Sequence, residues 1–255
     1  MEDEGDRVLD DGTYVWYRKG DSTPDPFDPS SGIKIKGVLW PKGSELAHLS
    51  IGVGLIFGLA LSIFLSWRQQ GFPPQLLPPV GVLLLALFYS MGFLLHEFGH
   101  RQVGKHYNLP TKFRLFTFGV VLTALGLVTP LKVGFPGAVM VVGLDEISKR
   151  TGLCKVAGPT VNIVLGTTLF ALSFWDAIPP PYNFMFCMGA FFNYQLGLFN
   201  LLPFGPLDGQ NIMRWKPFLW AGMMIVTFAL FAATLVIYSS PTLTESLYDL
   251  SSVFS

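Results

Sequence analysis

Two histidines and a glutamate lie within five consecutive residues, in the order His96-Glu97-Phe98-Gly99-His100. Four residues make close to one helical turn, so His96 and His100 would project from the same face of a helix and could bind one metal ion. Glu97, beside them, is suited to act as general base on a metal-activated water. The spacing therefore predicts a hydrolytic metal centre.

The setting of this motif is apolar, because residues 80–95, which precede it, carry no charge at all. A soluble metalloprotease carries such a motif on an amphipathic helix. The alternative to a metal site is that the motif is a chance match on a buried helix. Ionisable groups are costly in hydrocarbon, and those that occur there indicate a functional site.

The composition is typical of a membrane protein. The chain has 255 residues, of which 51% are hydrophobic and only 13% charged, whereas about 25% of the residues of a soluble domain are charged. Cys154 and Cys187 give no disulfide framework. No basic patch with interleaved aromatic residues indicates a nucleic-acid partner. The acidic, polar N-terminus predicts that no cleavable signal peptide is present.

Apolar segments long enough to cross a bilayer occupy residues 46–67, 80–104, 155–175, 183–202 and 217–238. We therefore expect a multi-pass α-helical membrane protein with about five transmembrane helices. An intramembrane domain would cover residues 45–240, with its core at 80–209, between a polar tail at 1–44 and a C-terminal tail at 241–255. Val38 is among the apolar residues that leave room in the first tail for short strands or a docking segment.

The segment 113–143 is apolar, but its glycines and prolines argue against one regular helix. Its stretches 118–123 and 138–142 are short and rich in β-branched residues, which favours strands. Non-helical backbone at membrane depth is tolerated where protein or a water-filled cavity surrounds it. We therefore expect a membrane-associated, re-entrant β element between the second and third transmembrane helices, although a full crossing is the alternative.

The basic residues support this topology. Five crossings with a re-entrant element place all of the 17 lysines and arginines except Arg68 on one side. The excess of positive charge marks that side as the cytoplasm. The N-terminus and the mouth of the site would then face the cytoplasm.

A catalytic zinc ion takes three protein ligands and keeps one position open. The best third ligand is Asp208, which follows a break at Pro203 and lies on the same side as the histidine motif. An ordinary Asp-Gly turn is the alternative interpretation of this residue. His48 and His106 are more typical of polar residues at the membrane interface.

Three segments of the chain together resemble the site-2 protease family of intramembrane zinc metalloproteases. They are His96-Glu97-Phe98-Gly99-His100, Ala157-Gly158-Pro159-Thr160-Val161-Asn162 and Asn200-x-x-Pro203-x-x-x-x-Asp208-Gly209. The resemblance implies that His96, His100 and Asp208 hold one zinc ion per chain and that Glu97 activates water. It also makes Asn162 a candidate contact for the scissile carbonyl or its oxyanion, with a hydrogen bond between helices as the alternative.

By this resemblance the chain would cleave transmembrane protein substrates within or near their membrane segments, as in regulated intramembrane proteolysis. It would be a compact form of the family, without the inserted PDZ-like domain of many members. An unwound substrate could add as a strand to the 113–143 element.

A protease of the prenylated-protein type is one alternative, but such enzymes use a downstream Glu ligand, and no Glu lies between Glu146 and Glu245. A non-proteolytic metal or proton transporter, or a pseudoprotease, is the other. The absence of a helical repeat argues against a transporter.

Overall fold

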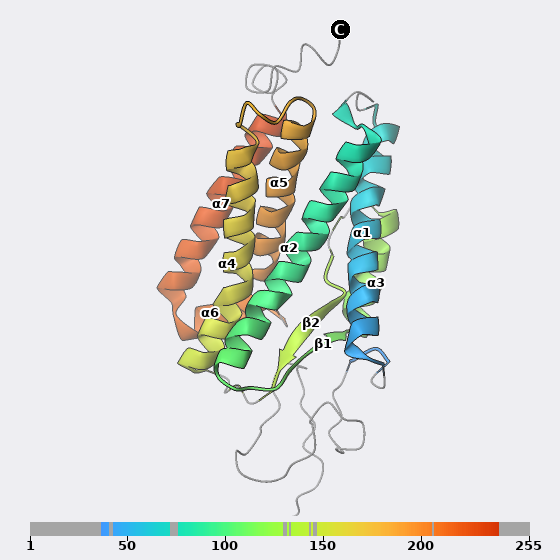
Figure 1. Cartoon of the computed structure of the whole chain (residues 1–255). Helices are drawn as coiled ribbons and strands as arrows, with labels where there is room; N and C mark the ends of the chain where they lie inside the picture. The colour runs from blue at the N-terminus through green and yellow to red at the C-terminus, as the bar shows by residue number, and fades with distance from the viewer. Residues whose placement is uncertain are drawn as a thin grey trace, which may run out of the picture.

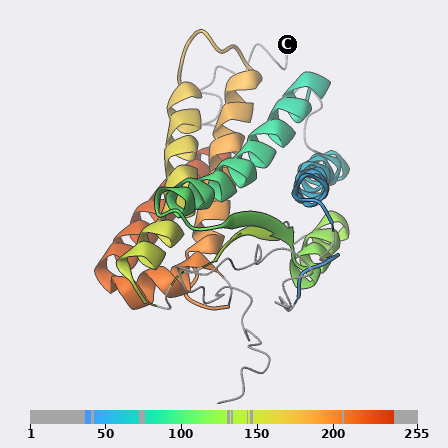
Figure 2. The same cartoon turned by 60° about the horizontal axis from the view of Figure 1, so that its bottom comes forward.

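The computed structural model describes residues 37–40, 43–71, 76–129, 132, 134–142, 144, 147–205 and 207–239. Long helices run roughly along one direction, with α4, α5 and α7 on one side of α2 and with α1 and α3 on its other side (Figure 1). A small sheet lies at one end of the molecule and extends from the end of α2 towards α1 and α3 (Figure 2).

Five long helices correspond to the five predicted crossings. They are α1 (Glu45–Gln69), α2 (Pro79–His106), α4 (Lys149–Leu172), α5 (Tyr182–Asn200) and α7 (Pro217–Ser239). Among the described residues, four of them are long and apolar enough to cross a membrane, namely α1, α2, α4 and α7. The protein is therefore a helical membrane protein. The helix α5 is present as predicted, but it does not belong to this apolar group.

The helix α5 owes its lower hydropathy to polar side chains that are buried inside the molecule. Asn193 is completely buried, and Asn183 and Asn200 are nearly so. Apolar residues between them, including Met188 and Phe192, pack with α1 and α2 in the main hydrophobic core. Polar groups in a bundle interior find partners on neighbouring helices, so an interior helix can be less apolar than one that faces lipid.

The sheet consists of two antiparallel strands, β1 (Thr111–Leu115) and β2 (Gly137–Val141), with Phe113 opposite Val139. The prediction of a strand at 138–142 is confirmed to within one residue. The predicted strand at 118–123 is wrong, because these residues belong to helix α3 (Thr117–Val128). The chain leaves the sheet after β1, forms α3 and returns beside its starting point, where Phe116 N–H donates to the carbonyl of Pro136.

Tertiary packing explains why this β-branched stretch is helical. The hydroxyl of Thr123 donates to the carbonyl of Gly119 within α3 and accepts from the backbone N–H of Phe135 in the returning segment. Gly119 lies so close to the carbonyl of Phe135 that a Cβ would not fit. These contacts outweigh the intrinsic β preference, which depends strongly on context.

Lys132 lies in the segment that returns to β2. Its Nζ donates to Ser62 Oγ at 3.0 Å and to the carbonyls of Gly126 and Leu127 near the end of α3. Ser62 lies 17 residues after Glu45, the first residue of α1, which is about 25 Å at helical rise. Lys132 is therefore far from the basic residues near the start of α1, with which the sequence analysis grouped it.

The described part of the N-terminal segment contacts β1 and α3. Val38 forms a β-bridge with Phe116, which agrees with the expected docking segment, while residues 1–36 and the C-terminal tail lie outside the described residues. The prediction for His48 is wrong. Its side chain is 0% exposed, because its two ring nitrogens bond the carbonyl of Trp40 and the N–H of Leu115.

Candidate metal centre

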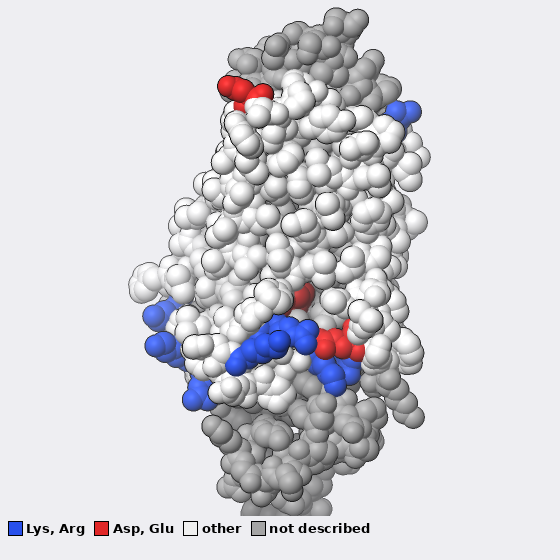
Figure 3. Space-filling view, viewed as in Figure 1, with Lys and Arg blue, Asp and Glu red and all other residues white. Residues whose placement is uncertain are grey.

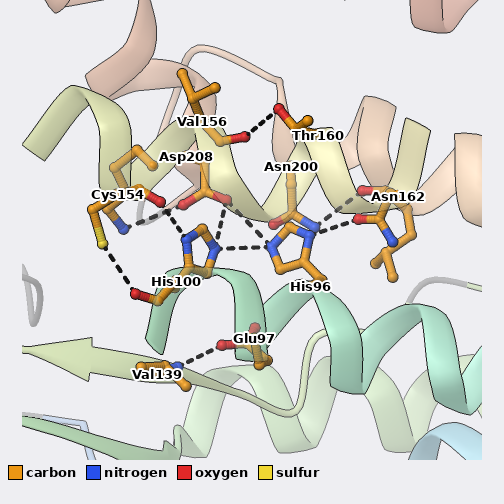
Figure 4. Close-up of polar contacts among 12 residues, drawn as sticks. His96, Glu97, His100, Val139, Cys154, Val156, Thr160, Asn162, Asn200 and Asp208 are labelled. Atoms are coloured by element: carbon orange, nitrogen blue, oxygen red, sulfur yellow. Dashed lines mark hydrogen bonds and ion pairs between the residues drawn. The ribbon is translucent and has the colours of Figure 1, made fainter. Parts of the chain in front are cut away.

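The structure brings His96, His100 and Asp208 together, although 107 residues lie between His100 and Asp208 in the chain. The Nε2 atoms of the two histidines are 3.1 Å apart. Oδ2 of Asp208 lies 3.3 Å from Nε2 of His96 and 3.1 Å from Nε2 of His100. All three residues are at most 5% exposed. Figure 4 shows the three groups converging between α2, α4 and α6.

The other ring nitrogen of each histidine is held by an oxygen acceptor. Nδ1 of His96 donates to the side-chain oxygen of Asn162 at 2.6 Å. Nδ1 of His100 donates to the backbone carbonyl of Cys154 at 2.7 Å. A proton on each Nδ1 leaves a lone pair on each Nε2, which is how metal-binding histidines are usually oriented.

The arrangement fits a zinc ion. Oδ2 of Asp208 is buried and lacks a hydrogen-bond partner of suitable geometry, so three atoms with lone pairs face one another at short distances. Such atoms repel unless a cation lies between them. Ligands of a tetrahedral zinc ion, bound at about 2.0–2.1 Å, stand roughly 3.3–3.4 Å apart. The observed separations of 3.1 to 3.3 Å are close to that value.

Gly158 of α4 provides the space for this centre. A Cβ at this position would lie 2.5 Å from Nε2 of His100 and 2.6 Å from Nε2 of His96. A Cβ at Gly99 of α2 would approach the carbonyl oxygen of Ala157 to 3.2 Å. Small residues on both helices therefore let α2 and α4 approach closely, and the glycine of the Gly-Pro motif keeps the ligand atoms accessible.

Asp208 is the first residue of the short helix α6 (Asp208–Trp215), and not part of an isolated turn. The next residue, Gly209, packs against the carbonyl of Leu201, where a Cβ would not fit. Nζ of Lys155 lies 3.3 Å from Oδ1 of Asp208, and a neighbouring positive charge favours the ionised form of a carboxyl group. An ionised carboxylate at this position can bind a cation.

Glu97 points to the other side of α2, towards β2 (Figure 4). This residue is 4% exposed, and its Oε2 accepts a hydrogen bond of 2.6 Å from the backbone N–H of Val139. The contact places the proposed base directly beside the sheet.

A cavity of about 260 Å³ adjoins Glu97. Its walls are mostly apolar and are formed by Leu49, Leu94, Leu95, Glu97, Phe98, Arg101, Phe113 and Val139. The guanidinium of Arg101 pairs with the Glu45 carboxylate at 2.9 Å, which joins α2 to the start of α1. The cavity is a space between α1, α2 and the sheet that a peptide side chain could enter.

Several residues that hold the site were not predicted from the sequence. The Cys154 carbonyl, the Gly158 gap and the Lys155 ammonium, 3.3 Å from Oδ1 of Asp208, all come from α4. Asn162 was selected, and its amide also donates to the carbonyl of Gly92. His106, at the exposed end of α2, stacks edge-to-face with Tyr107 and stays away from the centre, as expected.

Three curated proteins are similar to this chain. The "Putative zinc metalloprotease MJ0611" of Methanocaldococcus jannaschii is 32% identical over 149 residues, which are 55% of this chain and 75% of that protein. The "Zinc metalloprotease MJ0392" of the same organism is 32% identical over 135 residues, 52% of this chain and 33% of that protein. The "Putative zinc metalloprotease sll0528" of Synechocystis is 27% identical over 194 residues, 68% of this chain and 45% of that protein.

The chain thus spans less than half of the length of the second and third relatives. No family model and no solved structure matches the chain. The first relative is matched over three quarters of its length, and the His-Glu-x-x-His motif and the His-His-Asp cluster of this chain agree with its name. The chain belongs to the site-2 protease family of zinc metalloproteases.

Proposed function

We propose that this protein is an intramembrane zinc metalloprotease that hydrolyses peptide bonds within or near transmembrane segments of other proteins. His96, His100 and Asp208 would hold one zinc ion per chain, with Glu97 as general base. The observation that carries the proposal is the convergence of these three ligand atoms at one end of an apolar, membrane-length helix that also carries Glu97.

Zinc, when bound, supplies a Lewis acid and lowers the pKa of its bound water towards neutrality. Glu97 accepts the proton of the attacking water and passes it to the leaving nitrogen. Val139 N–H holds one oxygen of this carboxylate, which fixes the base at the edge of the cavity. Asn162 remains a candidate contact for the oxyanion, although its side-chain oxygen and amide already bond His96 and Gly92.

The edge of β2 that faces away from β1 is the proposed binding site for the unwound substrate. In an antiparallel pair, alternate residues direct their N–H and C=O groups away from the partner strand. Val139 does so, because its N–H bonds Glu97 and not β1, and by the same alternation so does Val141. A substrate strand added there would run past Glu97. The apolar walls of the adjoining cavity suit the side chains of a membrane segment.

We further propose five crossings with the site near the cytoplasmic surface. Lys155 near the start of α4 contacts Asp208, which follows α5. Because α4 carries the chain away from Lys155, α5 must bring it back across the molecule. Lysines and arginines gather at the end that contains the sheet and α6, while the middle of the face shown is almost uncharged (Figure 3). His100 is six residues from the end of α2, or about 9 Å at helical rise.

Cleavage of a model single-pass membrane protein by the purified chain tests this proposal. Wild type and Glu97→Gln would be compared, with the zinc content of both measured. Product from wild type alone, at equal zinc content, is the expected result. A transporter or pseudoprotease would hold zinc without giving product, and absence of zinc from both proteins would contradict the proposed centre.

A further inference from the structure

One helix contacts all three proposed zinc ligands. The Cys154 carbonyl accepts from His100, the Asn162 side chain accepts from His96, and Nζ of Lys155 lies 3.3 Å from Oδ1 of Asp208. All three contacts come from α4, within a stretch of nine residues. The first two orient the histidines, as outer contacts of zinc sites commonly do. The third contact involves a cation.

The Lys155–Asp208 pair is well shielded from solvent. The side chains are 13% and 6% exposed, respectively. A surface ion pair contributes little, but removal of one partner of a buried pair leaves an uncompensated charge. The two oxygens of Asp208 also have different neighbours, since Oδ1 faces Lys155 while Oδ2 faces the two histidines.

We propose that Lys155 is a positioning residue that holds Oδ1 of Asp208, so that only Oδ2 is presented to the zinc ion. The contact fixes the rotation of the carboxylate and selects binding through one oxygen. It also adds a positive charge beside a centre that has two carboxylates, Asp208 and Glu97. The inference rests on the zinc site proposed above. Lys155 lies outside all three of the motifs described in the sequence.

Zinc affinity of the full-length protein in detergent, measured by competition with a chromogenic chelator, tests this role without any substrate. Loss of an outer contact usually weakens metal binding by about 10–100-fold, and we expect a loss in that range for Lys155→Met. Lys155→Arg keeps the positive charge and should retain most of the affinity. Lys149→Met, at an exposed position in the first turn of the same helix, is the matched control and should bind zinc as wild type does.

A double-mutant cycle with Asp208→Asn separates positioning from a general structural effect. If Lys155 acts through Asp208, Lys155→Met should cause little further loss of affinity once Asp208 is replaced. The rise in melting temperature on zinc addition should also shrink in Lys155→Met, while the melting temperature of the metal-free protein changes much less. The rise in melting temperature on zinc addition can be measured for any variant that folds, including Lys155→Gln.

The inference would be overturned if Lys155→Met bound zinc as tightly as wild type does. It would also be overturned if Lys155→Met lowered the zinc affinity equally in the wild type and in Asp208→Asn. Either result would leave the zinc site intact. Absence of zinc from the wild-type protein would instead overturn the proposed function together with this inference. The two failures are therefore distinguishable.

Discussion

Nδ1 of His96 lies 2.6 Å from the side-chain oxygen of Asn162, a contact that joins α2 to α4 across 66 residues of sequence. The same asparagine donates from its amide to the carbonyl of Gly92, one turn earlier in α2. Both polar ends of a completely buried side chain are thus engaged by one helix. This geometry favours an orienting role for Asn162 over direct contact with substrate.

Replacement of Asn162 by alanine should therefore weaken zinc binding. The His96 ring would lose the acceptor that fixes its tautomer, and we expect a loss in affinity of about 10–100-fold, measured by chelator competition. Asn162→Asp keeps an oxygen acceptor and should retain more zinc than the alanine variant. Normal zinc content with a greatly reduced kcat would instead support the oxyanion role.

Gly158→Ala should abolish or strongly weaken zinc binding without a change in any ligand. The added methyl group would lie 2.5 Å and 2.6 Å from the two Nε2 atoms, where it would displace the imidazoles or the ion. Zinc content after purification, with a melting curve of the metal-free protein, is the measurement.

Gly197→Ala is the matched control for that variant. Gly197 is also buried in a helix, but its new Cβ would meet Asn162 Cβ at 3.4 Å, an ordinary contact distance. This protein should keep its zinc. Equal loss of zinc in both variants would mean that helix packing, and not the space at the ligands, causes the effect.

Proline at position 141 of β2 should reduce cleavage while zinc content stays normal. Val141 directs its N–H away from β1, so Val141→Pro removes a donor from the edge that faces away from β1 and leaves the pairing with β1 in place. Val139→Pro should act similarly and should also remove the contact to Glu97. Val141→Ala, which keeps the N–H, serves as control, and unchanged cleavage by both proline variants would refute strand addition at this edge.

Cysteine labelling can test the membrane orientation. Both native cysteines are buried, so single cysteines introduced at Arg68 and at Lys149 would report opposite ends of the molecule. A membrane-impermeant maleimide added to intact cells should label Arg68→Cys, and it should label Lys149→Cys only after the membrane is opened. The reverse pattern would invert the proposed orientation.

The four-residue spacing of the two histidines and the apolar residues before them were enough to predict where the chemistry lies. Spacing on a helix and the cost of burying charge in lipid are local properties, so they can be read without knowledge of the fold. Long apolar segments predicted the main helices for the same reason. The prediction of Asp208 as the third ligand also depended on the topology, in which the chain returns to the same side of the membrane.

Contacts between distant segments decided the rest. The stretch after Phe116 has β-branched residues that favour a strand, yet its packing against α1 and the returning segment makes it helical. His48 is buried because β1 supplies a backbone donor to its ring. Neither outcome has a sequence pattern of its own, since each depends on a partner far away in the chain.

The residue types of the centre could be predicted from local patterns in the chain, namely two histidines on one helical face, a glutamate next to them and an aspartate further on. How these residues are held depends on contacts between packed helices. The Cys154 carbonyl, the Gly158 gap and the Lys155 ammonium face the ligands because α4 packs closely against α2 and α6. A backbone carbonyl exists at every residue, and an empty space has no residue type, so only the packed fold shows which of them act at the site.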